Sequence, residues 1–528
     1  MKILIIVPKY TLSTERDYLF PLGLAYISST LKREKYSVDC LNLNQLKGTV
    51  EDIISSHLNN NIYEYVLTGG NSMMFSQFQK IIQITRKKSS SKIIIGGPII
   101  TSEPELMLNS FNPDFAVIGE GEETIVELIN VIEKKKNLKQ IKGIIYKDKE
   151  KVIITENREP IKDLEKIPYP DFDGFGFEEH LKNMHNLNFQ SNDFPRNYPI
   201  LMSRGCPNNC TFCWHGTRYR SRSIKDVMKE IEWAISKFKI NHLQIYDDCL
   251  GADKEQLKEF CKEIKKLSKK TGIHLTWNCQ FLTGSVETQI LKMMKDAGCE
   301  AISYGFESFS PTVLKSMRKP ITPEQIDFAL KETLKAKIAV QANFIFGDPA
   351  ETKETAKETL DYWKKNANTQ INLFFVQPYP GSDLYKYCIE KGIIKDRLDY
   401  IQNRMSPDAR INMTKEMSDK EIHDLGDEIL ILFSKYAKFV RPISMKKTNS
   451  NIYAFKVKCP YCHEEIVYKN YFIPNPFMYG FHLVCRNCHM QFVLVGAIQR
   501  IAYRFYSKTR SIRDKYVSIK LKLGRMFV

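Results

Sequence analysis

The sequence predicts an α/β protein with two successive parallel-sheet regions and a small cysteine-rich module near the carboxyl terminus. Residues 1–150 and residues 197–391 each alternate short apolar runs with segments of helical periodicity, which is typical of parallel sheets covered by helices. Four of the thirteen cysteines fall between positions 459 and 488 in two C-x2-C pairs. The 528 residues suffice for about three domains. No stretch approaches the ~20 apolar residues needed to span a bilayer.

Residues 1–150 predict a doubly wound parallel sheet. The expected buried strands are "KILIIVP" (2–8), "SVDCLNL" (37–43), "YVLTGG" (65–70), "KIIIGGP" (92–98) and "FAVIGEG" (115–121). Ligands of such sheets bind outside the carboxyl ends of the strands. Three of these ends carry glycine-rich turns, namely "TGGNS" (68–72), "GGP" (96–98) and "GEGE" (119–122). Glycines there let a large flat ligand approach the backbone closely.

Residues 151–196 predict a linker, since "EPIKDLEKIPYPDF" holds three prolines and no sustained period. Residues 197–391 predict an incomplete, six-stranded (β/α) barrel of the TIM type. Its expected strands are "YPILMSRG" (198–205), "HLQIYDD" (242–248), "HLTWNCQF" (274–281), "AISYGFES" (301–308), "AVQANFIFG" (339–347) and "INLFFVQPYPG" (371–381). The chemistry of such barrels lies at the carboxyl ends of the strands. Residues 392–440 predict a helical extension.

Residues 441–498 predict a zinc-ribbon-like module. The pairs "CPYC" and "CRNC" are separated by 22 residues, a spacing typical of four-thiolate zinc sites. A second, fully ligated iron–sulfur cluster is the alternative. The expected metal ligands are Cys459, Cys462, Cys485 and Cys488.

Residues 499–528 predict one basic amphipathic helix. Residues 441–528 hold 16 Lys and Arg and 3 Asp and Glu, so most of the net charge of +17 lies there. One face of this helix is an apolar stripe, and Lys and Arg occupy the other faces. The stripe consists of Ile501, Phe505, Ile512, Tyr516, Ile519 and Leu523. The pattern favours an interfacial membrane helix or a helix that packs on the barrel, with nucleic acid as a less favoured partner.

The segment "SRGCPNNCTFCWH" (203–215) contains three cysteines at C-x3-C-x2-C spacing. Three thiolates are one too few for a structural zinc site. They suit a [4Fe–4S] cluster whose fourth iron stays open for a small molecule. A zinc site completed by His215 is the alternative.

The motif "CPNNCTFC" resembles that of the radical SAM (S-adenosylmethionine) superfamily. Downstream, "YGFES" (304–308) resembles the segment that holds the methionine amino group of SAM, and "FIFGDPAET" (344–352) resembles the one that packs on its adenine. "PYPGSDLY" (378–385) resembles the sixth-strand turn. With the first sheet included, residues 1–440 resemble the cobalamin-binding radical SAM enzymes, whose amino-terminal domain is Rossmann-like.

This resemblance implies that Cys206, Cys210 and Cys213 hold three irons and that SAM chelates the fourth. The residues it assigns to SAM are Phe212, Asp248, Gly305, Glu307, Ser308, Ile345 and Gly347. Those it assigns to cobalamin are Gly69, Gly70, Asn71, Ser72, Gly96, Gly97, Pro98, Gly119, Glu120, Gly121 and Glu122. No D-x-H-x-x-G motif occurs in residues 1–150, so no histidine of that motif ligates cobalt, and an empty crevice is the alternative.

Two groups of charged residues near the expected site stay open in role. Asp247 and Asp248 either contact SAM or substrate or form a helix N-cap. Arg218, Arg220 and Arg222 either bind a carboxylate or phosphate of SAM or substrate or lie in a solvated loop.

The implied activity is reductive cleavage of SAM to a 5′-deoxyadenosyl radical, hydrogen abstraction from an unactivated carbon, and methyl transfer from methylcobalamin. The first alternative is a non-methylating oxidoreductase or cyclase of the same architecture. A second, of another class, is a zinc-ribbon nucleic-acid-binding or scaffold protein. A methylthiotransferase is disfavoured. The amino-terminal domain of that group supplies further cluster cysteines, whereas residues 1–150 hold only Cys40.

The expected partners are a small-molecule or lipid-linked substrate and an electron donor such as flavodoxin or ferredoxin. The first apolar run predicts a strand rather than a signal peptide. Clustered cysteines without a secretory signal favour the cytoplasm, with peripheral contact at the inner membrane face if the basic helix binds lipid.

Overall fold

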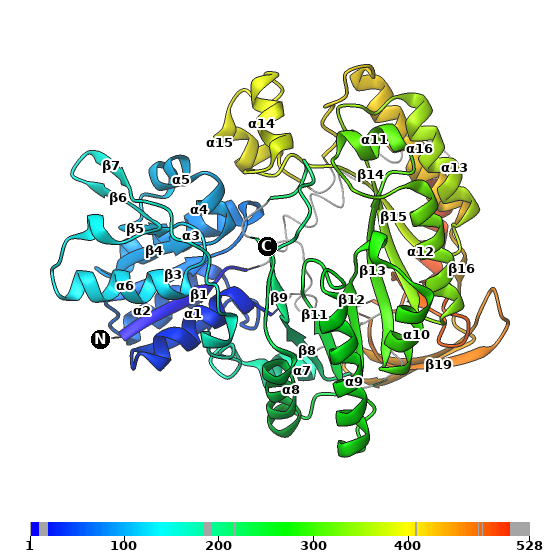
Figure 1. The fold of residues 1–528 in the computed structure, drawn as a ribbon, viewed down its shortest axis with the longest axis horizontal. Coiled ribbons are helices and arrows are strands. Elements are labelled where there is room, and N and C mark those ends of the chain that lie inside the picture. Colours follow the sequence, from blue (N-terminus) through cyan, green and yellow to red (C-terminus); the bar gives the residue numbers. More distant parts are fainter. Residues whose placement is uncertain are drawn as a thin grey trace. The chain divides into compact units, whose positions relative to one another are not determined.

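The computed structural model describes most of the chain in two compact units (Figure 1). The described residues are 2–9, 20–183, 193, 195–214, 218–406, 409–473, 475–477 and 479–506. Unit 1 consists of Met1–Asn183, Met202–Trp233 and Gln377–Ala409. Unit 2 consists of Met184–Leu201, Ala234–Val376 and Arg410–Val528. No helix in the described part of the chain combines the length and the apolar character that a membrane span requires.

The first sheet of unit 1 has seven strands in the order β2-β1-β3-β4-β5-β6-β7. Their bounds are β1 Lys2–Val7, β2 Ser37–Asn42, β3 Tyr65–Gly69, β4 Lys92–Gly96, β5 Phe115–Val117, β6 Ile144–Asp148 and β7 Lys151–Ile154. Strands β1 to β5 are parallel, which confirms the predicted sheet. Strands β6 and β7 form an antiparallel edge that the sequence pattern does not predict.

Helices wind this sheet on both faces. They are α1 Leu22–Arg33, α2 Val50–Asn60, α3 Phe75–Lys88, α4 Pro98–Ser102, α5 Pro104–Phe111 and α6 Glu122–Glu133. Helix α1 contacts α6, and α2 contacts α3. Ile3 to Ile6 of β1 are fully buried, as expected of a strand covered on both faces. The strand order reverses between β1 and β3, so the expected crevice lies at the carboxyl ends of these strands.

The sheet of unit 2 has six parallel strands in the order β15-β14-β13-β12-β11-β8. Their bounds are β8 Asn197–Ile200, β11 His242–Ile245, β12 Thr276–Gln280, β13 Cys299–Glu307, β14 Ala339–Phe346 and β15 Gln370–Phe375. The principal helices that follow strands are α8 Ile224–Phe238, α9 Lys254–Thr271, α10 Thr288–Asp296, α12 Pro323–Lys335, α13 Lys353–Lys365 and α14 Asp383–Glu390. This repeat confirms the predicted open (β/α)6 barrel.

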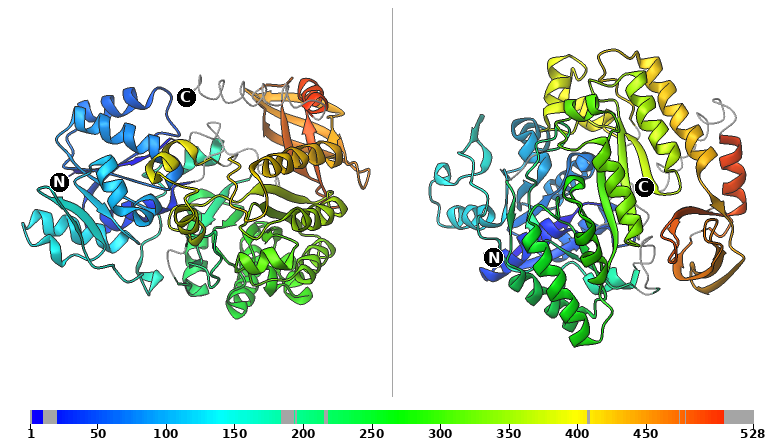
Figure 2. Two further views of the ribbon diagram at one scale, coloured as in Figure 1. Left: turned by 90° about the horizontal axis from the view of Figure 1, so that it is seen from above. Right: turned by 45° about the vertical axis from the view of Figure 1, so that its right-hand side comes forward.

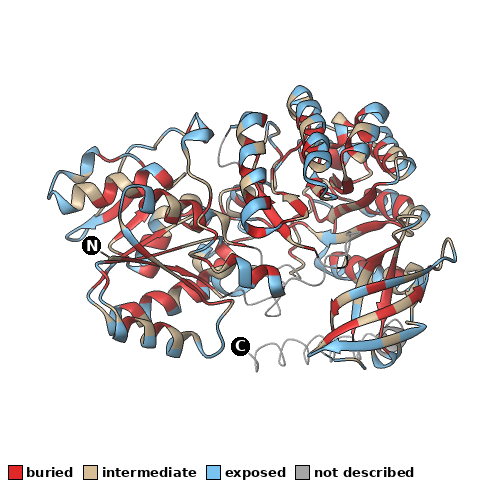
Figure 3. Cartoon of the chain, turned by 90° about the horizontal axis from the view of Figure 1, so that it is seen from below, coloured by how far each residue is buried: buried red, intermediate tan, exposed pale blue. Residues whose placement is uncertain are grey.

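Local sequence explains where the barrel helices begin. Helices α12 and α13 start with capping boxes at Thr322 and Thr352, in which side chain and backbone exchange hydrogen bonds. Their apolar residues face the sheet, and Figure 3 shows buried residues on the strands and exposed residues on the outer helix faces. Helix α16 (Asp419–Tyr436) belongs to the predicted helical extension.

A short antiparallel ribbon in unit 1, β9 (Ser203–Arg204) with β10 (Arg220–Ser221), frames the three-cysteine loop. Unit 1 also holds α14 and the short elements η1 Ser72–Met74, η2 Leu138–Gln140, η3 Leu164–Lys166, α7 Phe177–Asn183, α15 Arg397–Asp399 and η5 Tyr400–Arg404. Unit 2 also holds η4 Thr283–Ser285 and α11 Pro311–Ser316.

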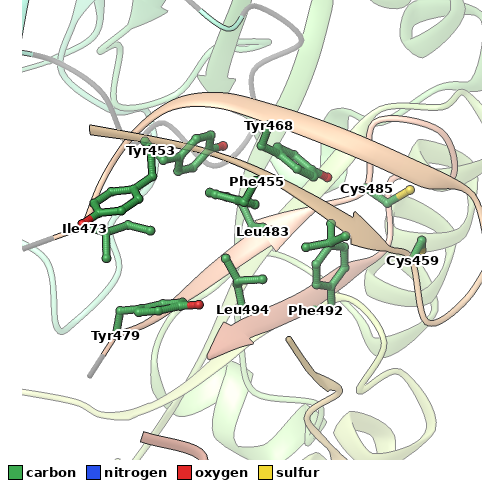
Figure 4. Packing of buried hydrophobic residues seen from close by; sticks show 12 residues of the cluster. Tyr453, Phe455, Cys459, Tyr468, Ile473, Tyr479, Leu483, Cys485, Phe492 and Leu494 are labelled. Atoms are coloured by element: carbon green, nitrogen blue, oxygen red, sulfur yellow. The ribbon is translucent and has the colours of Figure 1, made fainter. Parts of the chain in front are cut away.

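The cysteine-rich module of unit 2 contains two three-stranded sheets, β17-β18-β19 and β16-β21-β20 (Figure 2). The strands are β16 Phe439–Val440, β17 Ser444–Asn449, β18 Ile452–Lys458, β19 Glu465–Phe472, β20 Gly480–Val484 and β21 Gln491–Val495. Buried aromatic and aliphatic side chains fill its core, among them Phe455, Tyr468, Leu483 and Phe492 (Figure 4).

Helix α17 (Ala497–Tyr506) follows this module and begins the predicted basic helix. The side chain of Ile501 is exposed. Residues 507–528, with Ile512, Tyr516, Ile519 and Leu523 of the predicted stripe, lie outside the described residues, as does the side chain of Phe505.

Candidate functional site

The three cysteines lie in one loop that β9 and β10 close at its base. Arg204 pairs with Arg220 in the ribbon, and Gly205 adopts a φ of +85°, which turns the chain just before Cys206. Cys210 is buried, Cys206 is partly exposed and Cys213 is exposed. The Asn208 N–H donates to Cys206 Sγ at 3.4 Å. The three cysteines of the loop therefore differ in exposure, from the buried Cys210 to the exposed Cys213.

The ring of Phe212 is half-buried between the last two cysteines. The loop is also bonded to the start of α14, since the Leu384 N–H donates to the Thr211 carbonyl at 2.8 Å. In that turn, a Cβ on Gly381 would lie 2.5 Å from the Trp214 ring. The "PYPGSDLY" segment thus packs on the cysteine loop within unit 1. His215 lies outside the described residues.

Two glutamates of the β5 turn anchor the base of the cysteine loop. Glu120 lies 2.8 Å from Arg220 Nη2 and 3.3 Å from Arg204 Nη1, and Glu122 lies 2.7 Å from Arg204 Nη2. Burial opposes ionisation of Glu120, but the hydrogen bond from Arg220 and the charge of Arg204 outweigh it and lower the pKa of Glu120. Both residues, assigned to cobalamin from the sequence, therefore hold the cluster loop against the first sheet.

The three arginines of "RYRSRS" have different surroundings. Arg218 is exposed. Arg220 binds Glu120, as described above. Arg222 is 7% exposed and pairs with Asp226 at 2.7 Å and with the buried Glu230 at 2.5 Å. The carboxylates that meet Arg220 and Arg222 thus belong to the protein itself, and neither arginine lies in a solvated loop.

Glycines at the ends of β3 and β4 let two turns pack backbone against backbone. A Cβ on Gly97, whose φ is +92°, would lie 2.8 Å from the Gly70 nitrogen, and one on Gly69 would lie 2.9 Å from the Gly96 carbonyl oxygen. Among the described residues, no atom lies within 4 Å of a Cβ placed on Gly119, which is exposed and has a φ of +80°, although its N–H donates to Thr101 Oγ1 at 3.0 Å. This side of the β5 turn is therefore open, which fits the close approach of a flat ligand.

The other residues assigned to cobalamin lie on the same three turns. Asn71 caps the short helix η1 (Ser72–Met74) by accepting from the Met73 N–H at 3.1 Å, and Ser72 is buried. Pro98 opens α4. A Cβ on Gly121 would lie 3.0 Å from Ile27 Cδ1. Because β3, β4 and β5 are parallel, these turns share the carboxyl edge of the sheet.

The segment Gly305–Ser308 ends β13 in a strained turn. Glu307 has a φ of +61°, a conformation that costs energy for any residue with a Cβ, and the register with β14 shifts at this point. Its carboxylate lies 3.0 Å from Lys319 Nζ, and a Cβ on Gly305 would collide with that carboxylate. Ser308 is buried, and its Oγ lies 3.2 Å from Thr359 Oγ1. Strain of this kind is typical of functional turns.

The end of β14 holds a buried carboxyl group that the sequence does not single out. Gly347, with a φ of +96°, donates its N–H to Glu351 Oε2 at 3.1 Å, and Thr355 Oγ1 donates to Glu351 Oε1 at 3.1 Å. Burial raises the pKa of Glu351 to about 8 against these hydrogen bonds. Ile345 is half-buried just before this turn. Glu351 is therefore mainly protonated at neutral pH.

At the end of β11, Asp247 is buried and Asp248 is exposed. The helix N-cap alternative for this pair is wrong, because Asp253 caps α9 by accepting from the Gln256 N–H at 3.0 Å. Cys249 and Cys279 are buried, as expected of core thiols.

All strands of the unit 2 sheet run in parallel, so the turns that follow β11, β13 and β14 lie at one edge of it. Strand β8 also ends at that edge, and the chain continues from it into the cysteine loop.

Two family models match this chain. Residues 10–129 match the B12 binding domain and residues 200–362 match the radical SAM superfamily. The chain belongs to the cobalamin-binding radical SAM enzymes. Its cofactors are a [4Fe–4S] cluster, SAM and cobalamin, and enzymes of this kind act on small molecules and need a reductant. A nucleic-acid-binding or scaffold protein with a degenerate barrel is not favoured.

Similar proteins include both methyltransferases and a ring-forming enzyme. An uncharacterized methyltransferase of Pyrococcus horikoshii is 28% identical over 75% of this chain and 84% of that protein. The anaerobic magnesium-protoporphyrin IX monomethyl ester cyclase of Rubrivivax gelatinosus is 26% identical over 63% of this chain and 60% of that protein.

Among solved structures, the radical SAM methyltransferase TsrM of Kitasatospora setae, determined with cobalamin and a [4Fe–4S] cluster, has a TM-score of 0.61. Its identity is 17%, over 77% of this chain and 76% of that one. This likeness shows that the two share a fold.

Proposed function

We propose that this radical SAM enzyme is a C-methyltransferase that acts on an unactivated carbon of a small molecule. The observation that carries the proposal is the combination of a three-cysteine loop with a B12-type sheet whose β5 turn is exposed at Gly119. The similarity to the Pyrococcus horikoshii protein, named a methyltransferase, supports it.

Each group of residues has a distinct role in this proposal. Cys206, Cys210 and Cys213 would hold the cluster. The turns that end β3, β4 and β5 would hold cobalamin. Glu307, kept in place by Lys319, would accept hydrogen bonds from the cationic amino group of SAM. When bound, the cluster with SAM supplies one-electron activation of a C–H bond, and cobalamin supplies the methyl group.

The protonated carboxyl of Glu351 supports the SAM site in a different way. It accepts the Gly347 N–H, so it fixes the turn at the end of β14 without placing a negative charge beneath it. A neutral group there leaves Glu307 as the carboxylate that orients a cation. Ile345 and Gly347 would then offer an apolar edge and an open backbone to the adenine.

Methyl transfer is tested with SAM that carries a deuterated methyl group. The reduced holoenzyme, incubated anaerobically without substrate, should place the label on its bound cobalamin, as detected by mass spectrometry. Formation of 5′-deoxyadenosine without any label on cobalamin would contradict the methyltransferase and favour a non-methylating enzyme such as the cyclase relative.

We also propose that the cysteine-rich module contacts an anionic membrane surface and that the substrate is lipid-linked. Phe477, Ile498 and Ile501 are 66%, 51% and 56% exposed. The Ile498 N–H donates to the Phe477 carbonyl at 3.2 Å, so the first two lie side by side. Residues 441–506 hold nine Lys and Arg against two Asp and Glu. Exposed apolar side chains within a basic region are typical of interfacial membrane contacts.

Co-sedimentation with vesicles of phosphatidylglycerol and phosphatidylcholine tests the membrane contact. The variant Phe477→Ser/Ile498→Ser/Ile501→Ser should lose most of its binding. Ile62→Ser, at a position 89% exposed in unit 1, is the matched control and should bind like the wild type. Equal binding of both variants, or preference for duplex nucleic acid over vesicles, would contradict the proposal.

The electron donor, expected to be a flavodoxin or a ferredoxin, is tested by SAM cleavage with each.

A further inference from the structure

The four carboxyl-terminal cysteines form a second metal-binding geometry, separate from the cysteine loop. Their sulfur atoms all lie within 4.8 Å of one another. Cys459 Sγ lies 3.7 Å from Cys488 Sγ, and Cys462 Sγ lies 3.6 Å from Cys485 Sγ. A tetrahedron of Zn–S bonds of about 2.3 Å has sulfur–sulfur edges of about 3.8 Å. Two of the sulfur pairs thus already have about the spacing of a tetrahedral site, and the remaining pairs lie within 4.8 Å.

The two C-x2-C turns repeat one backbone arrangement. In the first, the Cys459 N–H donates to the Glu464 carbonyl at 2.9 Å and the His463 N–H donates to the Cys459 carbonyl at 3.2 Å. In the second, the Cys485 N–H donates to the Met490 carbonyl at 3.0 Å and the His489 N–H donates to the Cys485 carbonyl at 2.9 Å.

Both histidines lie in the left-handed region, with φ of +63° for His463 and +60° for His489. Backbone N–H groups of Tyr461 and Asn487 also donate to Cys459 Sγ and Cys485 Sγ, each at 3.4 Å. A repeated turn that directs its sulfurs and N–H groups inward is built to hold an ion.

The position of this cluster in the fold points to a structural role. Val484, next to Cys485, packs against Ala301 and Ala339 at the amino-terminal ends of β13 and β14. The Gln491 N–H donates to the Asn368 carbonyl just before β15 at 3.2 Å. The run from Ala301 to Ser308 along β13 covers about 23 Å at a strand rise of about 3.3 Å per residue. The cluster therefore lies at the opposite edge from the SAM residues, where barrels carry stability rather than chemistry.

We propose that Cys459, Cys462, Cys485 and Cys488 bind one structural Zn²⁺ that joins the two sheets of the module and holds it on the amino-terminal end of the barrel. Four protein thiolates leave no open coordination position, as in structural zinc sites. A [4Fe–4S] cluster would place the thiolates on four separate irons, farther apart than these sulfurs lie. A single iron fits the same sulfur spacing, so the experiment must distinguish the two metals.

Replacement of the three cysteines of the loop leaves the carboxyl-terminal cysteines as the site to be measured. The full-length variant Cys206→Ala/Cys210→Ala/Cys213→Ala, reconstituted anaerobically with iron, sulfide and zinc, should contain about one zinc and no iron. Iron in this variant, as one ion or as a cluster, would overturn the assignment. Because the variant leaves the module unchanged, its result does not depend on whether a module variant folds.

Two further measurements test the site and its role. Co²⁺ in place of zinc should give the strong absorption of a tetrahedral four-thiolate complex in the same variant, and Cys459→Ser/Cys485→Ser should abolish it. Removal of the metal by a chelator should lower the melting temperature of the triple variant, and zinc but not Fe²⁺ should restore it. An unchanged melting temperature would overturn the structural role.

Discussion

Glu120 anchors the base of the cysteine loop from another segment of the chain. Its carboxylate meets Arg220 and Arg204, the two residues that pair across the base of the cysteine loop. It also accepts the Ile161 N–H at 2.7 Å. We infer that Glu120 positions the loop, since it joins three segments that lie far apart in the chain.

Replacement of Glu120 by Gln removes the charge and leaves the arginines poorly compensated in a half-buried site. We expect a loss of about 2–3 kcal/mol in stability and a lower iron content per protein after anaerobic reconstitution. Glu156→Gln is the control, because Glu156 is 75% exposed in its pair with Lys142 and such pairs contribute little. A Glu120 variant with the stability of the wild type but poor iron content would assign Glu120 to the cluster alone.

Glu307, with its positive φ, is the residue that we propose to bind the amino group of SAM. Glu307→Gln keeps the shape of the side chain and loses the charge that faces Lys319. We expect SAM to bind at least about tenfold more weakly, as the loss of one charge-assisted hydrogen bond implies. Equilibrium binding of SAM to the reconstituted enzyme measures this change. Glu324→Gln, on the exposed face of α12, should leave the affinity unchanged.

At the scale of elements, the turn between β14 and α13 should make stability depend on pH. The folded pKa of Glu351 is about 8 and its ordinary value is 4.5, so the folded state binds the proton more tightly than the unfolded state. The stabilisation is fully present below the ordinary value and is lost as pH rises through the folded pKa. Within this window the contribution of Glu351 falls by about 1.4 kcal/mol per pH unit.

Glu351→Gln mimics the protonated carboxyl and should flatten this dependence. The measurement is the melting temperature of the anaerobic holoenzyme at a series of pH values between about 5 and 8. Glu354→Gln, on the exposed face of the following helix α13, is the matched control and should keep the wild-type slope. Identical slopes for both variants would show that Glu351 is ionised in the folded protein.

The hairpin of β6 and β7 shows what local patterns miss at this scale. Residues 151–154 alternate poorly and follow a charged turn, and the sequence indicates a linker there. These residues form a strand because β6 pairs antiparallel with β5 and offers them an edge. The pairing partner, rather than the propensity of the segment, decides such an edge strand.

At the scale of the molecule, contact between the cysteine-rich module and the barrel should contribute to the stability of unit 2. Val484 is buried against Ala301 and Ala339. Val484→Asp buries an unpaired charge there, and we expect a loss of at least about 3 kcal/mol. Val467→Asp, at a position 42% exposed on the same module, is the control and should change little. Chemical unfolding followed by intrinsic fluorescence measures both, and equal stabilities would mean that the module does not buttress the barrel.

Local sequence patterns are sufficient to predict the parallel strands of both sheets, the cysteine loop, the paired C-x2-C turns and hence the family. These features are local, since strand–helix alternation and ligand spacing repeat within a few tens of residues. The position of Glu307 at the end of a strand is also predictable from the "YGFES" segment.

Which charged side chains contact one another depends on the tertiary fold. Glu120 contacts Arg220 across 100 positions of sequence, and burial by the fold raises the pKa of Glu351 to about 8. The structure likewise decided that the four-thiolate module lies on the amino-terminal end of the barrel rather than near the SAM residues. Ion pairs, pKa values and packing surfaces depend on distances and burial between remote segments, and no local pattern encodes them.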